Sequence, residues 1–243
     1  MSIFPSVQAP NLFAAFDDLK ASATLSDDWI AFRLALVRAQ LALYGALSAS
    51  PAPVETRSAE GGASPVHPTS LRYDEAQLSA LLRAAASELQ QKGHAITILA
   101  RLLEAAGEHS GLLSNLAHAA CQRVAQPAER ATDIDTLSGS LGLPADVLEF
   151  FGLILAAPYV SVAARRGAAL VQASKTKTTA HGACPACGAP AAAALLVGEE
   201  GRRLLCCPLC AAVYPFARKP CPSCGSSETL GVLFGEQDAG HWL

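Results

Sequence analysis

The residues with the clearest chemistry in this chain are cysteines arranged as Cys-x-x-Cys pairs. Cys184 and Cys187 form the first pair, and Cys207 and Cys210 form the second, 19 residues further on. Two residues between cysteines let both sulfurs face one metal ion from a tight turn, and two such turns complete a tetrahedral site. We therefore expect these four thiolates to bind one metal ion. The spacing leaves iron and zinc equally open, because both metals accept four thiolates in a tetrahedron.

A third pair, Cys221 and Cys224, repeats the Cys-Pro-x-Cys-Gly form of the first pair. It predicts the first half of a second metal site. No matching second half follows before Leu243, so this second site is incomplete here; either the sequence is cut short or the pair acts differently. Two other roles stay open for the pair, which could recruit ligands from a partner or act as a reactive thiol pair.

Three further residues could be confused with ligands. Cys206 could replace Cys207, but only Cys207 preserves the two-residue spacing of its pair. Cys121 falls in an apolar helical stretch and is expected to be an inert core thiol. His181 precedes the first pair, and with four cysteines present we expect it to be a surface linker residue.

The elements that must position the first four cysteines form a hairpin. Ala191–Val197 reads as one strand and Arg202–Cys206 as its return, joined by a turn at Gly198–Gly201. A module this small buries too little apolar surface to fold well alone, so a bound metal would supply much of its stability. The last residues, 231–243, read like a further strand and turn.

Helical periodicity dominates the rest of the chain. Ser26 is a predicted N-cap, Asp74 with Gln77 fits a capping box, and Pro158 is expected to divide a buried apolar stretch into two helices. The expected helices are Asn11–Ala23, Asp27–Leu47, Glu75–Lys92, His94–Ala106, Gly111–Ala125, Pro144–Ala157 and Pro158–Val171.

The predicted fold class is mainly α, a helical bundle followed by a small rubredoxin-like or zinc-ribbon β module with an incomplete second ribbon. The change in cysteine content near residue 172 marks the main domain boundary. The expected segments are an all-α domain at 1–172 with a mobile loop at about 48–70, a linker at 173–182, the metal ribbon at 183–219 and the incomplete ribbon at 220–243.

Composition narrows the cellular context. The chain has 243 residues, 51% of them hydrophobic, and a formal net charge of -3, which gives no general attraction to nucleic acid or anionic membranes. Residues 1–10 lack the pattern of a secretory signal. The longest apolar run, 150–164, is shorter than the roughly 20 residues that span a bilayer. We expect a cytoplasmic protein without membrane insertion, where paired thiols favour metal over disulfides.

The sequence offers no enzyme signature such as a Walker loop, G-x-S-x-G, G-x-G-x-x-G or HExxH. Four thiolates also close the metal's coordination shell, so we expect no catalysis and assign no catalytic residue. One rival interpretation is a nucleic-acid-binding zinc ribbon, and another is a thiol-redox sensor that uses Cys221 and Cys224. The first depends on a local group of basic residues: Lys175, Lys177, Arg202, Arg203, Arg218 and Lys219.

The cysteine region resembles the formate dehydrogenase accessory protein FdhE family. The resemblance is carried by C184-P-A-C-G-A-P190, by G201-x-R203-x-L205-x-C207-x-L-C210 and by R218-x-P-C221-x-x-C224. It is specific over about 182–225 and architectural over 1–172, where Pro158-Tyr159 precedes the linker as in that family.

Three features depart from the family pattern. Val213, Tyr214 and Pro215 stand where the family has an acidic–aromatic–His cluster, and Leu204 replaces a tyrosine. No fourth Cys-x-x-Cys follows.

The resemblance implies a cytoplasmic assembly factor that binds the catalytic subunit of a respiratory formate dehydrogenase during maturation before export. It also implies rubredoxin-like sites that hold iron and respond to redox conditions. A homodimer stays open, and nucleic acid is not the expected partner.

Overall fold

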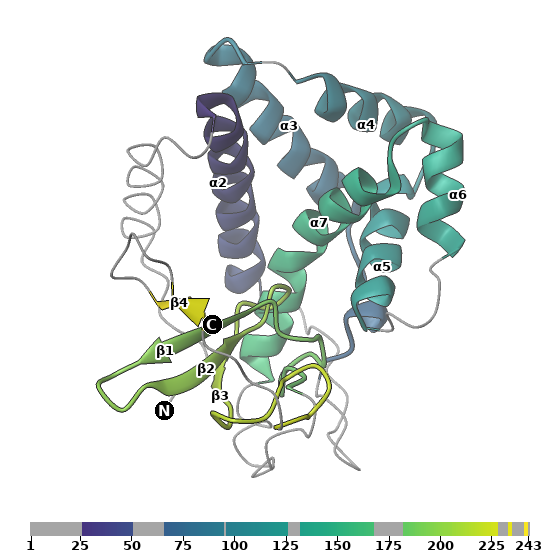
Figure 1. The fold of residues 1–243 in the computed structure, drawn as a ribbon. Helices are drawn as coiled ribbons and strands as arrows, with labels where there is room; N and C mark the ends of the chain where they lie inside the picture. The colour runs from purple at the N-terminus through teal and green to yellow at the C-terminus, as the bar shows by residue number, and fades with distance from the viewer. Residues whose placement is uncertain are drawn as a thin grey trace.

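A computed structural model describes residues 26–50, 66–94, 96–125, 132–167 and 182–227, together with two short strands at 233–234 and 241–242. Helices make up most of this described part, and a small β module follows them (Figure 1). The predicted fold class, a helical region followed by a ribbon-like module, is thus confirmed. The helices are α2 (Asp27–Ala49), α3 (Glu75–Gln91), α4 (Thr97–Glu108), α5 (Leu112–Ala125), α6 (Thr132–Leu141) and α7 (Ala145–Arg166), with a 3-10 turn, η2, at Pro68–Ser70.

Two predicted helix starts are confirmed. The Ser26 side chain accepts a hydrogen bond from the main-chain nitrogen of Trp29 at 3.2 Å, and this cap opens α2. The Asp74 carboxylate accepts from the main-chain nitrogen of Gln77 at 3.0 Å and opens α3. Both caps satisfy donors that the first turn of a helix leaves without an intrahelical partner.

The start of α3 differs from a simple capping box in one respect. In a capping box the Gln77 side chain would accept directly from the main-chain nitrogen of Asp74. Here the hydroxyl of Tyr159 lies between these two groups. It accepts from the main-chain nitrogen of Asp74 at 3.2 Å and donates to the Gln77 side-chain oxygen at 2.6 Å. A residue of α7 therefore completes the cap of α3 and ties the two helices together.

The predicted break at Pro158 is wrong. α7 continues from Ala145 to Arg166 with Pro158 inside it. Proline has no N–H, so it leaves the carbonyl of Ile154 without its intrahelical donor. The Gln40 side chain of α2 donates to that carbonyl at 2.8 Å, which explains how the helix passes through the proline.

Two other expectations need correction. The predicted loop at about 48–70 is shorter in the structure, because α2 continues to Ala49 and residues 66–70 are packed, with Val66 fully buried. No helix was expected at Thr132–Leu141, where α6 forms. Its Gly, Ser and Asp residues have low helix propensity, and Ile134 anchors it in the core. The predicted helix Asn11–Ala23 and nearly all of the linker 173–182 lie outside the described residues.

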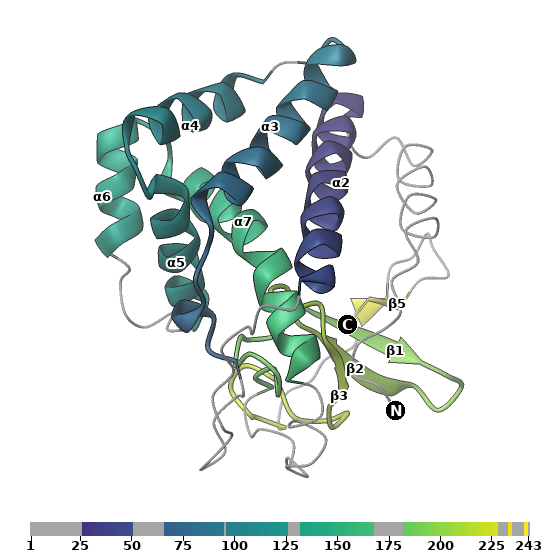
Figure 2. The same cartoon turned by 180° about the vertical axis from the view of Figure 1, so that it is seen from behind.

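α7 is the central helix of the core. It packs between α2 on one side and α5 with α6 on the other (Figures 1 and 2). Gly152 allows the close approach of α5, since a Cβ atom there would lie 2.5 Å from the Ala120 Cβ and 2.6 Å from the Leu116 carbonyl oxygen. A larger residue would push the two helices apart.

The β module begins with the predicted hairpin. The hairpin consists of two five-residue strands that pair antiparallel, with Ala193 opposite Cys206 and Val197 opposite Arg202. A third strand, which the sequence analysis did not predict, pairs with the other edge of the return strand. A separate two-stranded pairing lies in the last residues, where the sequence analysis predicted one strand; the predicted turn lies outside the described residues. The strands are β1 (Ala193–Val197), β2 (Arg202–Cys206), β3 (Val213–Pro215), β4 (Leu233–Phe234) and β5 (His241–Trp242).

Two of the described helices, α2 and α7, are long and apolar enough to cross a membrane if only length and composition are considered. In α7, 67% of the most apolar stretch is buried inside the protein. Core packing therefore accounts for its hydropathy, and the absence of membrane insertion stays a prediction.

Candidate metal centre

The three Cys-x-x-Cys pairs adopt one backbone conformation. In each, the first cysteine's nitrogen donates to the carbonyl five residues later. The residue after the second cysteine has a positive φ, and its nitrogen donates back to the first cysteine's carbonyl. We call these turns the first, second and third knuckles. In the first knuckle the bonds are Cys184 N to Ala189 O at 2.8 Å and Gly188 N to Cys184 O at 2.8 Å. In the second they are Cys207 N to Ala212 O at 2.9 Å and Ala211 N to Cys207 O at 3.2 Å. In the third they are Cys221 N to Ser226 O at 2.7 Å and Gly225 N to Cys221 O at 2.9 Å.

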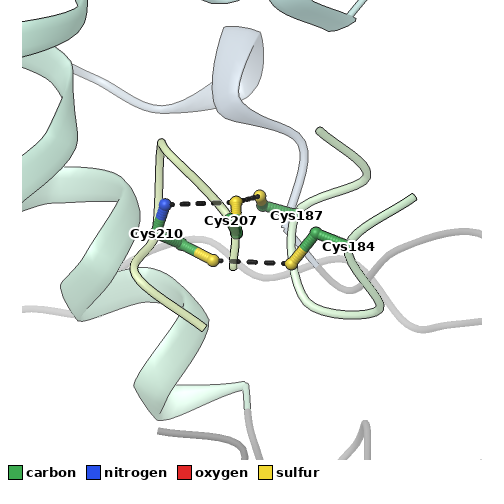
Figure 3. Close-up of side chains that lie close together, drawn as sticks. All are labelled: Cys184, Cys187, Cys207 and Cys210. Atoms are coloured by element: carbon green, nitrogen blue, oxygen red, sulfur yellow. Dashed lines mark hydrogen bonds between the residues drawn. The ribbon is translucent and has the colours of Figure 1, made fainter. Parts of the chain in front are cut away.

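The first two knuckles bring the four predicted ligands together (Figure 3). All four sulfurs lie within 4.8 Å of one another, and the Cys184–Cys210 and Cys187–Cys207 sulfurs are each 3.5 Å apart. A tetrahedron with metal–sulfur bonds of about 2.3 Å has sulfurs about 3.8 Å apart. The arrangement therefore fits one tetrathiolate-bound metal ion, and the sulfurs are too far apart for disulfides.

The four sulfur groups are buried and strongly coupled. Hydrogen bonds from neighbouring thiols, first from Cys184, lower the pKa of Cys207. Hydrogen bonding to Cys184 is also the leading cause that raises the pKa values of Cys187 and Cys210. The cluster alone thus favours the charged form of Cys207 and opposes ionisation of Cys187 and Cys210. A divalent cation removes that conflict, because it neutralises thiolates that the buried site would otherwise keep protonated.

Two contacts position the cluster, one inside the β module and one from the helical part. Tyr214 of β3 is buried, and its hydroxyl donates to the Gly182 carbonyl at 2.6 Å, just before the first knuckle. Burial, the leading cause, raises the pKa of this tyrosine. The second contact comes from outside the β module: the main-chain nitrogen of Val66 donates to the Ala186 carbonyl, inside the first knuckle, at 3.2 Å. The helical part therefore contacts the metal centre through the segment that precedes α3.

The third knuckle is formed but belongs to no group of three or more ligand side chains within the described residues. Cys221 is half-buried and Cys224 is exposed. Hydrogen bonds from the main-chain nitrogens of Cys224 and Ser223, with a smaller effect of the Arg203 charge, lower the pKa of Cys221. Metal binding at this pair stays a prediction.

Contacts with the rest of the β module fix the position of the third knuckle. The Arg203 side chain donates to the carbonyls of Arg218 at 3.3 Å and Pro220 at 2.9 Å. A Cβ atom at Gly182 would lie 2.6 Å from the Cβ of Pro222, so these two backbones approach closely. The third knuckle therefore lies against the start of the first.

The remaining cysteine and histidine candidates can also be placed. Cys207 joins the cluster, while Cys206 ends β2 and is partly exposed. Cys121 lies in the helical core as expected, and burial raises its pKa to about 12. His181 lies outside the described residues.

Sequence reasoning missed the contacts made by Val66 and the structural role of Tyr214. The surrounding Pro, Ser and Gly residues predict a loop at Val66 and so mask it. The signal that could have found it is a β-branched apolar residue next to His67-Pro68. In the sequence, Tyr214 stands out as a departure from the family pattern, although an aromatic residue near a knuckle can also cover buried thiolates.

The site can hold a metal ion structurally, since four thiolates leave no coordination position for water or substrate. Fold and site together define a helical protein with a tetrathiolate ribbon. No protein-family model matches the chain, and no curated protein matches it. Among solved structures, the chain is similar to the FdhE protein from Pseudomonas aeruginosa. The identity is 23%, the match covers 87% of this chain and 68% of that chain, and the TM-score is 0.49.

Proposed function

We propose that this protein is a cytoplasmic accessory factor that binds the catalytic subunit of a respiratory formate dehydrogenase during its maturation, before export. The observation that carries the proposal is the order and form of the three Cys-x-x-Cys motifs, which resemble the FdhE family across residues 182–225. A closed tetrathiolate site supports a binding role over catalysis, because it offers no open coordination position. The metal would hold the ribbon folded and so shape a surface for the partner.

The metal-binding residues in this proposal are Cys184, Cys187, Cys207 and Cys210, with iron or zinc as the ion. Their burial and mutual distances fit this role. The proposed organisation is the helical domain at 1–172, joined by the linker at 173–182 to the ribbon at 183–219 and the incomplete ribbon at 220–243.

The test is co-purification of the full chain with the catalytic subunit, followed by metal analysis of the same sample. The expected result is a stable complex that contains one tetrathiolate-bound metal ion per copy of this protein. A metal-loaded protein that fails to bind the subunit would overturn the assignment. Tight, steeply salt-dependent retention on DNA or RNA would favour the nucleic-acid interpretation instead.

The arginines of the ribbon support a protein partner over nucleic acid. The Arg203 side chain is engaged with two carbonyls and lies 5.5 Å from the ring centroid of Phe216. The Arg218 side chain donates to the Glu200 carbonyl at 3.3 Å, and Arg202 pairs with the Glu200 carboxylate at 3.4 Å. These contacts hold the side chains against the module and leave fewer of their N–H donors for phosphates.

A second candidate function rests on the third knuckle. The tight turn holds the Cys221 and Cys224 side chains together, and Cys224 is exposed. Two such thiols can form a disulfide with the loss of two protons and two electrons to a peroxide, which is reduced to water. Mass spectrometry after mild peroxide treatment tests this sensor role. Unmodified Cys221 and Cys224 at full metal occupancy would contradict it.

A further inference from the structure

Helix α2 carries more apolar surface than the core covers. Apolar residues surround most of its circumference, but only one side packs against α3 and α7. The side chains of Val37, Leu41 and Tyr44 are half-buried, and they follow one another along a single face of the helix. An apolar helix face left partly open in a folded protein often marks a binding surface.

This face lines a cavity of about 540 Å³, within the range typical of ligand sites. Ala157, Ser161 and Arg165 of α7 form the facing wall, each one turn after the last. Cys210 and Ala211 of the second knuckle also line the cavity. The hollow therefore joins the helical part to the metal module and extends along about 12 Å of helix.

The shape suits a helical segment. Ala157 and Ser161 are small and lie one turn apart, so the main chain of another helix can approach this wall closely. Leu41 and Tyr44 offer apolar contact on the other side. A short amphipathic helix laid in an apolar groove is a recurring mode of protein recognition.

The charge of the groove indicates which charged group the bound segment carries. Among the described lining residues, Arg165 is the charged one. Its guanidinium lies 5.7 Å from the ring centroid of Tyr44. A guanidinium beside an aromatic ring in a partly dry hollow suits a carboxylate, because a charge-assisted hydrogen bond is strong there.

The wall contributed by the second knuckle contains strain. Ala211 has a φ of 58°, whereas Gly188 and Gly225 occupy the matching positions of the other knuckles. Alanine is less stable than glycine in this left-handed conformation, because its Cβ lies too close to the following carbonyl oxygen. The strained residue lines the cavity, and strain kept at a site is often associated with function.

We infer that this cavity binds an amphipathic helical segment of the partner protein, with apolar side chains against Leu41 and Ala157 and a carboxylate on Arg165. The inference rests on the proposed function, since the partner is the formate dehydrogenase catalytic subunit. Because Cys210 and Ala211 complete the wall, the groove forms fully only when the metal module is folded.

The experiment measures the affinity of the purified catalytic subunit for the metal-loaded full chain and its variants. Arg165→Glu places a negative charge where the partner's carboxylate binds, and Ser161→Leu fills the groove. Each is expected to weaken binding at least tenfold. The matched controls are Arg83→Glu and Ala46→Leu, which make the same kinds of change at exposed positions and should bind like the unaltered protein. Metal content and unfolding temperature verify that each variant is folded, and Arg165→Gln serves as a milder second variant.

The outcomes separate the two proposals. If the unaltered protein binds the subunit and the groove variants bind equally well, the groove assignment is overturned and the proposed function stands. If the unaltered, metal-loaded protein does not bind the subunit, the proposed function fails and the groove assignment fails with it. If binding is weakened in the groove variants but not in the control variants, both the proposed function and the groove assignment are supported.

Discussion

The side-chain amide of Gln40 donates a hydrogen bond to the main-chain carbonyl of Ile154, and the nitrogen–oxygen distance is 2.8 Å. This carbonyl is the one that Pro158 leaves without a donor inside α7. A single side chain from α2 therefore replaces a missing main-chain bond and allows a long helix to include a proline. The same contact anchors α2 on the central helix of the core.

Gln40→Leu removes this donor and leaves a part-buried carbonyl unsatisfied. We expect the free energy of unfolding to fall by about 1–3 kcal/mol, measured by urea denaturation. In a Pro158→Ala background the same change should cost less, because the introduced alanine restores an N–H to the helix ladder. Gln90→Leu, at an exposed position of α3, is the control and should stay within about 0.5 kcal/mol. Equal costs in both backgrounds would show that the Ile154 carbonyl does not depend on Gln40.

Tyr159→Phe removes the hydroxyl that accepts from Asp74 and donates to Gln77. We expect a loss of about 1–3 kcal/mol of stability, because a main-chain donor and a side-chain acceptor lose their partner in a part-buried position. Hydrogen exchange at the first turn of α3 should also become faster. The control is Tyr44→Phe, at a half-buried ring in the cavity. Unchanged exchange at α3 would argue against a capping role for Tyr159.

Gly152→Ala tests the packing of α5 on α7. The added methyl group would meet the Ala120 side chain at 2.5 Å and the Leu116 main chain at 2.6 Å. We expect a loss of about 1–3 kcal/mol from overpacking, read from thermal unfolding. Gly45→Ala is the matched control, since a Cβ there meets nothing within 4 Å. That change lies inside α2 and should stabilise the protein by about 0.5–1 kcal/mol. The two substitutions should therefore have opposite signs.

Cys184→Ser with Cys207→Ser removes one ligand from each knuckle of the cluster. We expect the double variant to lose its metal and the ordered structure of the ribbon, because metal binding and folding are coupled in such modules. Metal analysis and hydrogen exchange over residues 182–216 measure both effects. Cys206→Ser, next in sequence but outside the cluster, should keep the metal. Full metal content in the double variant would contradict the assignment of these ligands.

Much of the ribbon could be predicted from the sequence because its determinants are local. The Cys-x-x-Cys spacing, the glycine-rich turn and the apolar strands each act within a few residues. The same holds for the caps at Ser26 and Asp74, whose side chains bond to nitrogens three positions away.

The features that escaped prediction depend on contacts between distant segments. Pro158 predicts a helix break locally, and only the donor from Gln40 shows why the helix continues. α6 has weak propensity and forms where Ile134 is buried in the core. The cavity beside the second knuckle could not be foreseen either, because it depends on how α2 and α7 meet the ribbon.

The bond from Val66 to Ala186 has a consequence for synthesis of the protein on the ribosome. The segment that precedes α3 is made early, but its partner in the first knuckle emerges only after all six described helices. The contact therefore cannot form during most of translation. Metal supply at the end of synthesis would then act as a late checkpoint, and a shortage should leave chains whose helices are formed but whose early segment is open to cellular proteases.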